Sequence, residues 1–269
     1  RRFRIPVDSA LVVSNGTVAP EDAHLVVPAV EWVFPDIGLQ KNNLILLDML
    51  ATNNWERPVY FAITTGSEAY IGLEEYFQLE GMAYRLVPIR TAVSEARPGR
   101  INTRILYDNI MNKFVWGNMY KPGVYLNEDH RRVAVNFKDI MQRLALALVA
   151  EQQNEKAIEV LDLAMKVMPE ENMAHNYFSL LIAEAYYEAG AFDQANELIA
   201  RLADLYGQDL SFYFSFTGRR ANQVEGRKQE ALAIFQRMAF LTDFYEQEPL
   251  AEEVNAAFDV FYEMYIRGF

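Results

Sequence analysis

The stretch EQQNEKAIEVLDLAMKVMPE, residues 151–170, recurs with the same pattern as EAGAFDQANELIARLADLYG at residues 188–207. Ala157 of the first copy aligns with Ala195 of the second, 38 positions later. A fixed period of this size is typical of repeat architectures, in which each unit buries its apolar face against its neighbours. The second half of the chain is therefore expected to be a stack of similar helical units.

A third and less regular copy, VEGRKQEALAIFQRMAF at residues 224–240, places Ala231 36 positions after Ala195. In every copy a large apolar residue follows the alanine four positions later, which puts both side chains on one helical face. Each copy is expected to be the second helix of a pair. The first helices of the three pairs are expected at residues 131–150, 174–189 and 210–222.

This pattern resembles the tetratricopeptide repeat, whose unit is two antiparallel helices. The resemblance implies a tetratricopeptide-like stack over residues 129–269, ended by a capping helix that begins near Pro249. Such a stack presents a groove that can hold a peptide. Four side chains of the second repeat are expected on or near its inner face: Tyr177, Glu184, Tyr187 and Glu188. The alternative is that these residues belong to the core or to the solvated surface.

The first half reads as a mixed α/β domain over residues 1–128. Short runs rich in β-branched residues predict strands at residues 10–14, 24–34, 58–64 and 82–89. Apolar residues at helical spacing predict helices at residues 41–54, 67–81 and 102–118, with Gly81 as a helix stop. Residues 58–89 then form a strand–helix–strand unit, whose two strands are expected to be parallel in one sheet.

The turn Thr65-Gly66-Ser67 lies between the first strand and the helix of this unit. A helix that begins near Ser67 offers free backbone N–H groups beside two hydroxyls, an arrangement that can receive an anion. The simpler interpretation is that Thr65 or Ser67 caps the helix and that Gly66 lets the chain turn. No phosphate-binding loop or dinucleotide motif accompanies the turn, so no cofactor is predicted.

Composition excludes several classes of function. The chain has no cysteine, and its three histidines lack the spacing of paired ligands, so no metal site is expected. The net charge of −12 disfavours binding to phosphate backbones, so no nucleic-acid partner is expected. Residues 1–128 carry −2 of this charge and residues 129–269 carry −10, which agrees with a domain boundary after residue 128.

No apolar run reaches the roughly 18 residues that a membrane-spanning helix needs. The start of the chain, RRFRIPVDSA, lacks the apolar core of a signal peptide, and it has no initiating methionine. The sequence is therefore expected to be a piece of a longer protein.

Four phrases in order carry a further resemblance: KNNLILLDMLATNNWERPVYFA, YIGLEEYFQLEGMAYRLVPI, YDNIMNKFVWGNM and the repeat stretch. Together they resemble the soluble C-terminal region of large bacterial multi-pass membrane proteins that are related to protein O-mannosyltransferases. The resemblance implies a membrane-embedded N-terminal half and a position on the periplasmic side of the inner membrane. It also implies that the catalytic carboxylate lies on a membrane loop, and no residue of this chain matches that motif.

Two functions follow from these patterns. In the first, the chain is a non-catalytic domain of a glycosyltransferase that binds an acceptor polypeptide or a partner protein. In the second, the α/β half is itself a sugar-binding, anion-binding or enzymatic domain centred on Thr65-Gly66-Ser67. An open pocket with converging polar groups at this turn would favour the second, because a cap is filled by its own chain.

Overall fold

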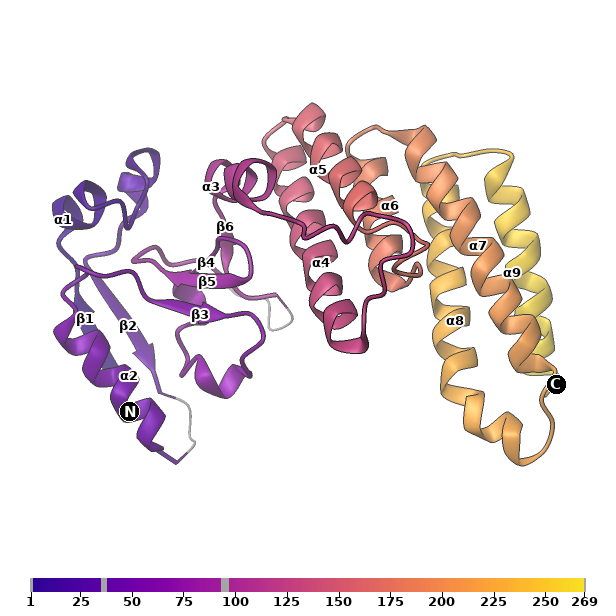
Figure 1. Ribbon diagram of the computed structural model, residues 1–269, viewed down its shortest axis with the longest axis horizontal. Helices are drawn as coiled ribbons and strands as arrows, with labels where there is room; N and C mark the ends of the chain where they lie inside the picture. The colour runs from indigo at the N-terminus through magenta and orange to yellow at the C-terminus, as the bar shows by residue number, and fades with distance from the viewer. Residues whose placement is uncertain (1, 35–37, 93–96, 269) are drawn as a thin grey trace. The chain divides into compact units, whose positions relative to one another are not determined.

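The computed structural model describes residues 2–34, 38–92 and 97–268. The chain forms two compact units, Arg1–Phe114 and Val115–Phe269 (Figure 1). The first unit is a mixed α/β structure and the second is built from helices that pack on one another, so the predicted fold class is confirmed. The predicted domain boundary after residue 128 stays a prediction.

The first sheet of unit 1 has two antiparallel strands, β1 (Arg2–Pro6) and β2 (Ala29–Val33). Phe3 lies opposite Trp32, and the two rings stack with their centroids 5.3 Å apart. The strand predicted over residues 24–34 is longer than the observed one, because β2 covers only Ala29–Val33.

A helical segment connects β1 to the rest of this sheet. The strand predicted over residues 10–14 is wrong, because these residues lie in helix α1 (Ser9–Ser14). Asp8 caps this helix, its Oδ1 accepting the amide of Ala10 at 2.9 Å. A cap of this kind satisfies a free N–H group and favours the helix over an extended conformation. A 3₁₀ helix, η1 (Pro20–Leu25), follows.

The second sheet of unit 1 has four strands. In spatial order they are β3 (Tyr60–Ala62), β5 (Ala83–Leu86), β4 (Phe77–Leu79) and β6 (Arg100–Ile101). Strands β3 and β4 both run antiparallel to β5, and β6 runs parallel to β4. The predicted parallel strand–helix–strand unit is therefore wrong, since β3 and β5 are adjacent antiparallel strands.

The helix predicted over residues 67–81 is also wrong. This segment forms two short 3₁₀ helices, η2 (Ser67–Ala69) and η3 (Glu74–Tyr76), before it enters β4. Ile71 and Gly72 separate them with φ values of +52° and +88°. A left-handed backbone cannot continue a right-handed helix, so the helical spacing of apolar residues here has a different origin.

That origin is an aromatic core against one face of the second sheet. Phe77 of β4 stacks on Tyr84 of β5 with centroids 5.3 Å apart, and Phe61 and Tyr70 lie 4.8 and 5.1 Å from Phe77. All four side chains are buried. Gly81, predicted to stop a helix, instead turns β4 into β5 with φ +131°.

Two further helices complete unit 1. The predicted helix at residues 41–54 is confirmed as α2 (Lys41–Thr52). The helix predicted over residues 102–118 is shorter: α3 (Thr103–Asp108) continues as a π-helical turn, η4 (Asn109–Lys113), and then ends. It stops early because the backbone becomes extended at the next residue and left-handed soon after it.

Unit 2 contains six helices among the residues that the structure describes. They are α4 (Glu128–Ala150), α5 (Asn154–Val167), α6 (Tyr177–Glu188), α7 (Phe192–Phe214), α8 (Arg219–Phe244) and α9 (Leu250–Ile266). Each helix packs on the next along the chain, α4 also packs on α6, and α7 also packs on α9. Helices α4 and α6 confirm the first two predicted first helices.

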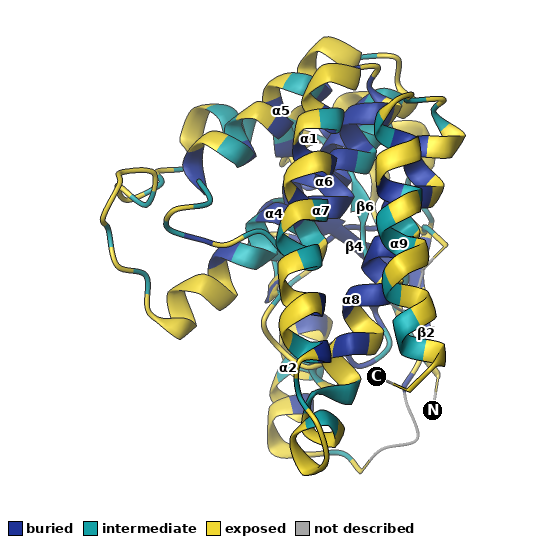
Figure 2. Ribbon diagram, turned by 90° about the vertical axis from the view of Figure 1, so that its right-hand side faces the viewer, coloured by how far each residue is buried: buried dark blue, intermediate teal, exposed yellow. Residues whose placement is uncertain are grey.

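The third pair differs from the prediction. No helix spans residues 210–222, because α7 runs to Phe214 and Gly218, with φ +59°, separates it from α8. The third sequence copy lies inside α8, which packs on α9, the predicted capping helix. The small residues of the three copies are buried: Ala157 and Ala195 are 0% exposed and Ala231 is 3% exposed. Buried positions lie on the sides of the helices that face their neighbours (Figure 2).

Candidate functional site

Helix α6 carries all four residues predicted to line the groove of the stack. Glu184 forms an ion pair with Arg237 of α8, and Glu188 accepts a hydrogen bond from the Tyr245 hydroxyl at 2.7 Å. Tyr187 is 2% exposed and stacks on Tyr245 with centroids 4.6 Å apart. These three side chains therefore connect α6 to residues in and just after α8.

The two tyrosines at this contact are held by their surroundings. The Tyr187 hydroxyl donates to Oδ1 of Asn196 at 2.7 Å, and burial raises its pKa to about 12. Burial, followed by the bond to Glu188, raises the pKa of Tyr245. Tyr177, at the start of α6, has an exposed ring, in contrast to the buried Tyr187. Ligand binding by these residues stays a prediction.

The turn Thr65-Gly66-Ser67 does not cap a helix as predicted. The Thr65 hydroxyl donates back to the carbonyl of Ala62 at 2.7 Å, and η2 begins at Ser67 without a side-chain cap. Because η2 is only three residues long, it cannot present the array of free N–H groups that holds an anion. Ser67 is exposed and lies at the wall of an open cleft.

This cleft has a volume of about 860 Å³, within the size range of ligand-binding pockets. Its described lining residues are Glu31, Trp32, Val33, Ile63, Ser67, Tyr70, Gly72, Glu74, Glu75, Tyr84, Arg90 and Pro98. They come from β2, from the segment between β3 and β4, and from β5 and the chain after it. The aromatic core of the second sheet supports the cleft through Tyr70 and Tyr84, whose centroids are 5.9 Å apart.

The charges of the cleft are predominantly negative. Glu31 pairs with Arg4 at 3.0 Å, and Glu75 pairs with Arg90 at 2.7 Å. Glu74 forms no ion pair with any residue that the structure describes. The cleft therefore has one carboxylate whose charge no neighbouring cation neutralises.

Two donors at the cleft have no hydrogen-bond partner among the described residues. Trp32 is 7% exposed, and its buried indole N–H has no partner in the described part of the chain. A buried donor of this kind costs about 1–3 kcal/mol. The second donor is a backbone amide on the outer edge of β2.

The register of the first sheet identifies this edge. The amide of Val7 bonds the carbonyl of Pro28 at 3.1 Å, so alternate residues face β1 and the N–H and C=O groups of Glu31 and Val33 face away from it. The Tyr76 hydroxyl bonds both backbone groups of Glu31 at 3.1 Å. No group in residues 2–34, 38–92 or 97–268 bonds the backbone of Val33.

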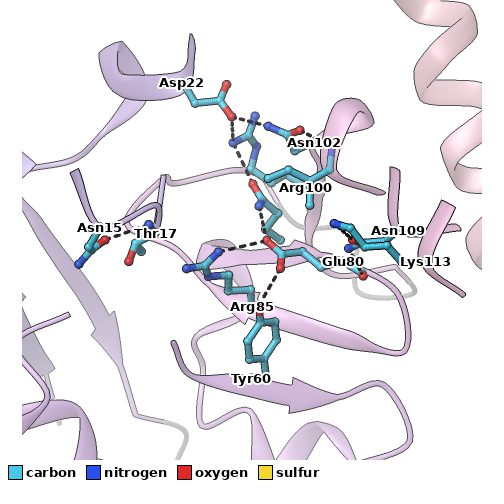
Figure 3. Close-up of polar contacts among 12 residues, drawn as sticks. Asn15, Thr17, Asp22, Tyr60, Glu80, Arg85, Arg100, Asn102, Asn109 and Lys113 are labelled. Atoms are coloured by element: carbon cyan, nitrogen blue, oxygen red, sulfur yellow. Dashed lines mark hydrogen bonds and ion pairs between the residues drawn. The ribbon is translucent and has the colours of Figure 1, made fainter. Parts of the chain in front are cut away.

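The opposite face of the second sheet carries a row of polar residues that sequence reasoning missed (Figure 3). Tyr60, Arg85, Gln78 and Arg100 lie side by side in register across β3, β5, β4 and β6. Glu80 joins the row, accepting the Tyr60 hydroxyl and the Gln78 amide, each at 2.8 Å. The alternation of polar and aromatic residues in β4 and β5 is the signal that could have revealed it.

The row continues beyond the sheet to η1. Arg100 Nη1 lies 2.8 Å from Oδ2 of Asp22, and the Asn102 side chain donates to the same oxygen at 2.9 Å (Figure 3). Burial alone would raise the pKa of Asp22, but the Arg100 hydrogen bond and charge outweigh it, so the pKa is lowered. Each carboxylate faces an arginine, and this charge balance is that of a structural network.

A second buried polar cluster lies in unit 2. Lys138 Nζ and His175 Nδ1 each lie 3.1 Å from the Ser179 hydroxyl oxygen, and His175 Nε2 lies 3.6 Å from Glu170. This is the set of groups found around catalytic serines. Lys138 and Ser179 are both 0% exposed, however, so a substrate cannot reach the hydroxyl in this conformation.

The described residues hold neither a metal-binding cluster nor a membrane-spanning helix. No cluster of three or more histidine, aspartate or glutamate side chains is placed to hold a metal ion there. None of the helices in that part of the chain has both the length and the apolar character needed to cross a membrane.

The cleft and the polar row from Asp22 to Asn102 both fall in the N-terminal part of the chain. This part is similar to a known family. Residues 1–105 match the family model described as TMEM260-associated domain 2. The match fits a relation to TMEM260-like proteins and covers every described residue that lines the cleft. No curated protein and no solved structure matched the chain.

Proposed function

We propose that this chain is a non-catalytic binding region of a membrane-embedded glycosyltransferase related to protein O-mannosyltransferases. It is held on the periplasmic side of the membrane by a transmembrane region that is absent from this chain. There it binds an acceptor polypeptide, or a partner protein, for the membrane-embedded part. The observation that carries the proposal is an open, partly aromatic cleft inside the region that matches the TMEM260-associated family model.

The cleft supports polypeptide binding better than α6 does. Tyr187 is buried, and Glu184 and Glu188 already bond residues of unit 2. A ligand at α6 would have to displace these contacts. The cleft, in contrast, offers groups on β2 and η3 that have no partner among the described residues, so a ligand need displace no contact of theirs.

The helical stack of unit 2 is proposed as a tetratricopeptide-like scaffold. Its hairpins and its three buried alanines support that grouping. Arrays of this kind present extended surfaces to other proteins. In this proposal the stack contacts a partner protein or the membrane-embedded half, while unit 1 holds the extended acceptor.

A sugar- or anion-binding role for the α/β half is the second candidate. Ser67 lies in an open cleft with converging polar groups, which favours a site over a simple turn. Three carboxylates and one arginine line this cleft, so an anion is a poor match. A neutral sugar remains the competing ligand, and the experiment must include it.

The test is selection of peptides from a random library on the purified chain, followed by measurement of affinity for two variants. Ser67→Trp places a large ring at the wall of the cleft, and Ser14→Trp places the same ring at an exposed position on α1. We expect Ser67→Trp to abolish binding and Ser14→Trp to preserve it. Selection of no peptide, together with binding of mannose oligosaccharides, would contradict the proposal.

The non-catalytic part of the proposal has its own test. Incubation of the purified chain with lipid-linked mannose and the selected peptides should yield no glycosylated product. Turnover above that of a heat-denatured control would place catalytic groups in this chain and overturn this part of the proposal.

A further inference from the structure

We infer that the cleft beside β2 recognises an extended peptide segment with a lysine or arginine side chain. This inference rests on the proposed polypeptide-binding function and names the class of segment. Three groups at the cleft lack partners in the described chain: the Glu74 carboxylate, the Trp32 indole N–H and the Val33 backbone. An extended peptide with a cationic side chain offers a partner to each.

The backbone of Val33 selects an extended ligand. Its N–H and C=O groups face away from β1, on the edge where Tyr76 already bonds the backbone of Glu31. A peptide strand placed at this edge bonds both groups of Val33, which is how exposed sheet edges take up peptides. A metal ion cannot reproduce that pair of bonds, because it donates no hydrogen bond.

Glu74 selects the side chain. The other two carboxylates of the cleft are paired with Arg4 and Arg90, and Glu74 alone has no cation beside it in the described residues. A lysine or arginine of the ligand supplies the missing charge. The rings of Tyr70 and Tyr84 line the same cleft and provide aromatic surface for the aliphatic stem of such a side chain.

The indole of Trp32 points to a ligand independently of the acidic groups. The side chain is more than nine-tenths buried, it lines the cleft, and its N–H has no acceptor within the described residues. A peptide carbonyl is an acceptor of suitable strength for it. A basic peptide supplies both a carbonyl for Trp32 and a cation for Glu74, whereas a purely cationic ligand supplies only the cation.

The experiment measures affinity for labelled peptides in which lysine alternates with threonine, by fluorescence anisotropy. Successive residues of a strand point to opposite faces, so all lysines of this peptide lie on one face. The comparison peptide carries acetyl-lysine at the same positions, which removes the charge and keeps the length. We expect the lysine peptide to bind about 10-fold more tightly, the factor typical of a hydrogen bond to a charged group.

Two glutamate variants locate the effect. Glu74→Gln should abolish the preference for lysine, while Glu56→Gln, an equal change of charge at an exposed position of unit 1, should preserve it. N-methylation of the peptide amides that face Val33 should weaken binding to the protein without substitutions, because it removes hydrogen bonds to the edge of β2. Loss of the preference in both variants would show an effect of net charge alone and would overturn the inference.

The outcomes separate this inference from the proposed function. Equal affinity for the lysine and acetyl-lysine peptides would contradict recognition of a basic side chain, but it would leave the proposed polypeptide binding intact. Binding of mannose oligosaccharides with no binding of either peptide would overturn both. Unchanged affinity after N-methylation would contradict strand addition at Val33.

Discussion

The hydroxyl of Tyr76 bonds both the amide and the carbonyl of Glu31, each at 3.1 Å, although the two residues are 45 positions apart. This contact links the outer edge of β2 to the end of η3, beside the cleft. It also leaves Val33, two residues further along β2, as the open position at that edge. Tyr76 therefore ties the edge of β2 to the segment that carries Glu74 and Glu75 of the cleft.

Replacement of Tyr76 by phenylalanine should lower the free energy of unfolding by about 1–3 kcal/mol, because the backbone groups of Glu31 lose their partner. Urea denaturation measures the change. Tyr125→Phe, at an exposed position, is the matched control and should change stability by less than about 0.5 kcal/mol. Equal effects of the two substitutions would mean that the Tyr76 contact contributes nothing specific.

Asp22 should stabilise unit 1 through the charge of its carboxylate. Its folded pKa is lowered, so this stability is present above the unfolded value near 3.8 and is lost as pH falls through the folded pKa. Asp22→Asn should cost about 1–3 kcal/mol at neutral pH, and the difference from the unmodified chain should shrink in acid.

Unfolding curves at several pH values test this expectation. Asp48→Asn, at an exposed position on α2, should show no comparable dependence on pH. A cost for Asp22→Asn that stays constant down to low pH would show that hydrogen-bond geometry, and not the charge facing Arg100, maintains the contact.

Lys138 should make unit 2 more stable as pH rises. Burial lowers its pKa from 10.5 to about 8, so between these values the unfolded chain binds more protons than the folded one. The free energy of unfolding should therefore increase between pH 8 and pH 10, by up to about 3 kcal/mol. Lys138→Met should remove this increase, since methionine fills a similar volume without a titrating group.

The measurement is chemical denaturation of the unmodified chain and of Lys138→Met across this pH range. Lys156→Met, at an exposed position on α5, is the control. A pH dependence that persists in Lys138→Met would assign it to other groups, such as His175, which contacts the same serine.

Ala157 and Ala195 should not tolerate a large side chain, because both are completely buried between packed helices. Substitution of either by phenylalanine overfills the core and should cost about 1–3 kcal/mol. Thermal unfolding measures this, with Ala150→Phe at the exposed end of α4 as the control. Unchanged melting temperatures for both buried positions would mean that the repeat alignment does not describe the packing.

Sequence periodicity predicted the helices of unit 2 well because each helix packs on neighbours along the chain. The third pair was misread because its alanine motif was assumed to keep the role of second helix after the period shortened. In unit 1 the spacing of Tyr70, Leu73 and Phe77 imitated a helix. These residues converge on the core through a left-handed turn and a short strand, which no local pattern reveals.

The candidate site was partly accessible from sequence. Ser67, named from the sequence as part of a possible anion-binding turn or as a helix cap, caps no helix and lies at the wall of the cleft. Ligand binding by Ser67 stays a prediction. The partners of Ser67 across the cleft, Trp32 and Val33, come from a strand in another sheet. The positions of Trp32 and Val33 at the cleft depend on long-range packing, which the sequence does not show. The same is true of the contacts of Glu184 and Glu188, whose partners Arg237 and Tyr245 lie far along the chain.

Chemical-shift mapping on the isotopically labelled chain tests most directly whether the proposed peptide ligand binds the cleft of unit 1. Titration with the lysine–threonine peptide should shift the amide signals of Val33, Ser67 and Glu74 and leave those of Tyr177 and Glu188 in place. Saturating shifts centred on α6, with none around the cleft, would contradict the account.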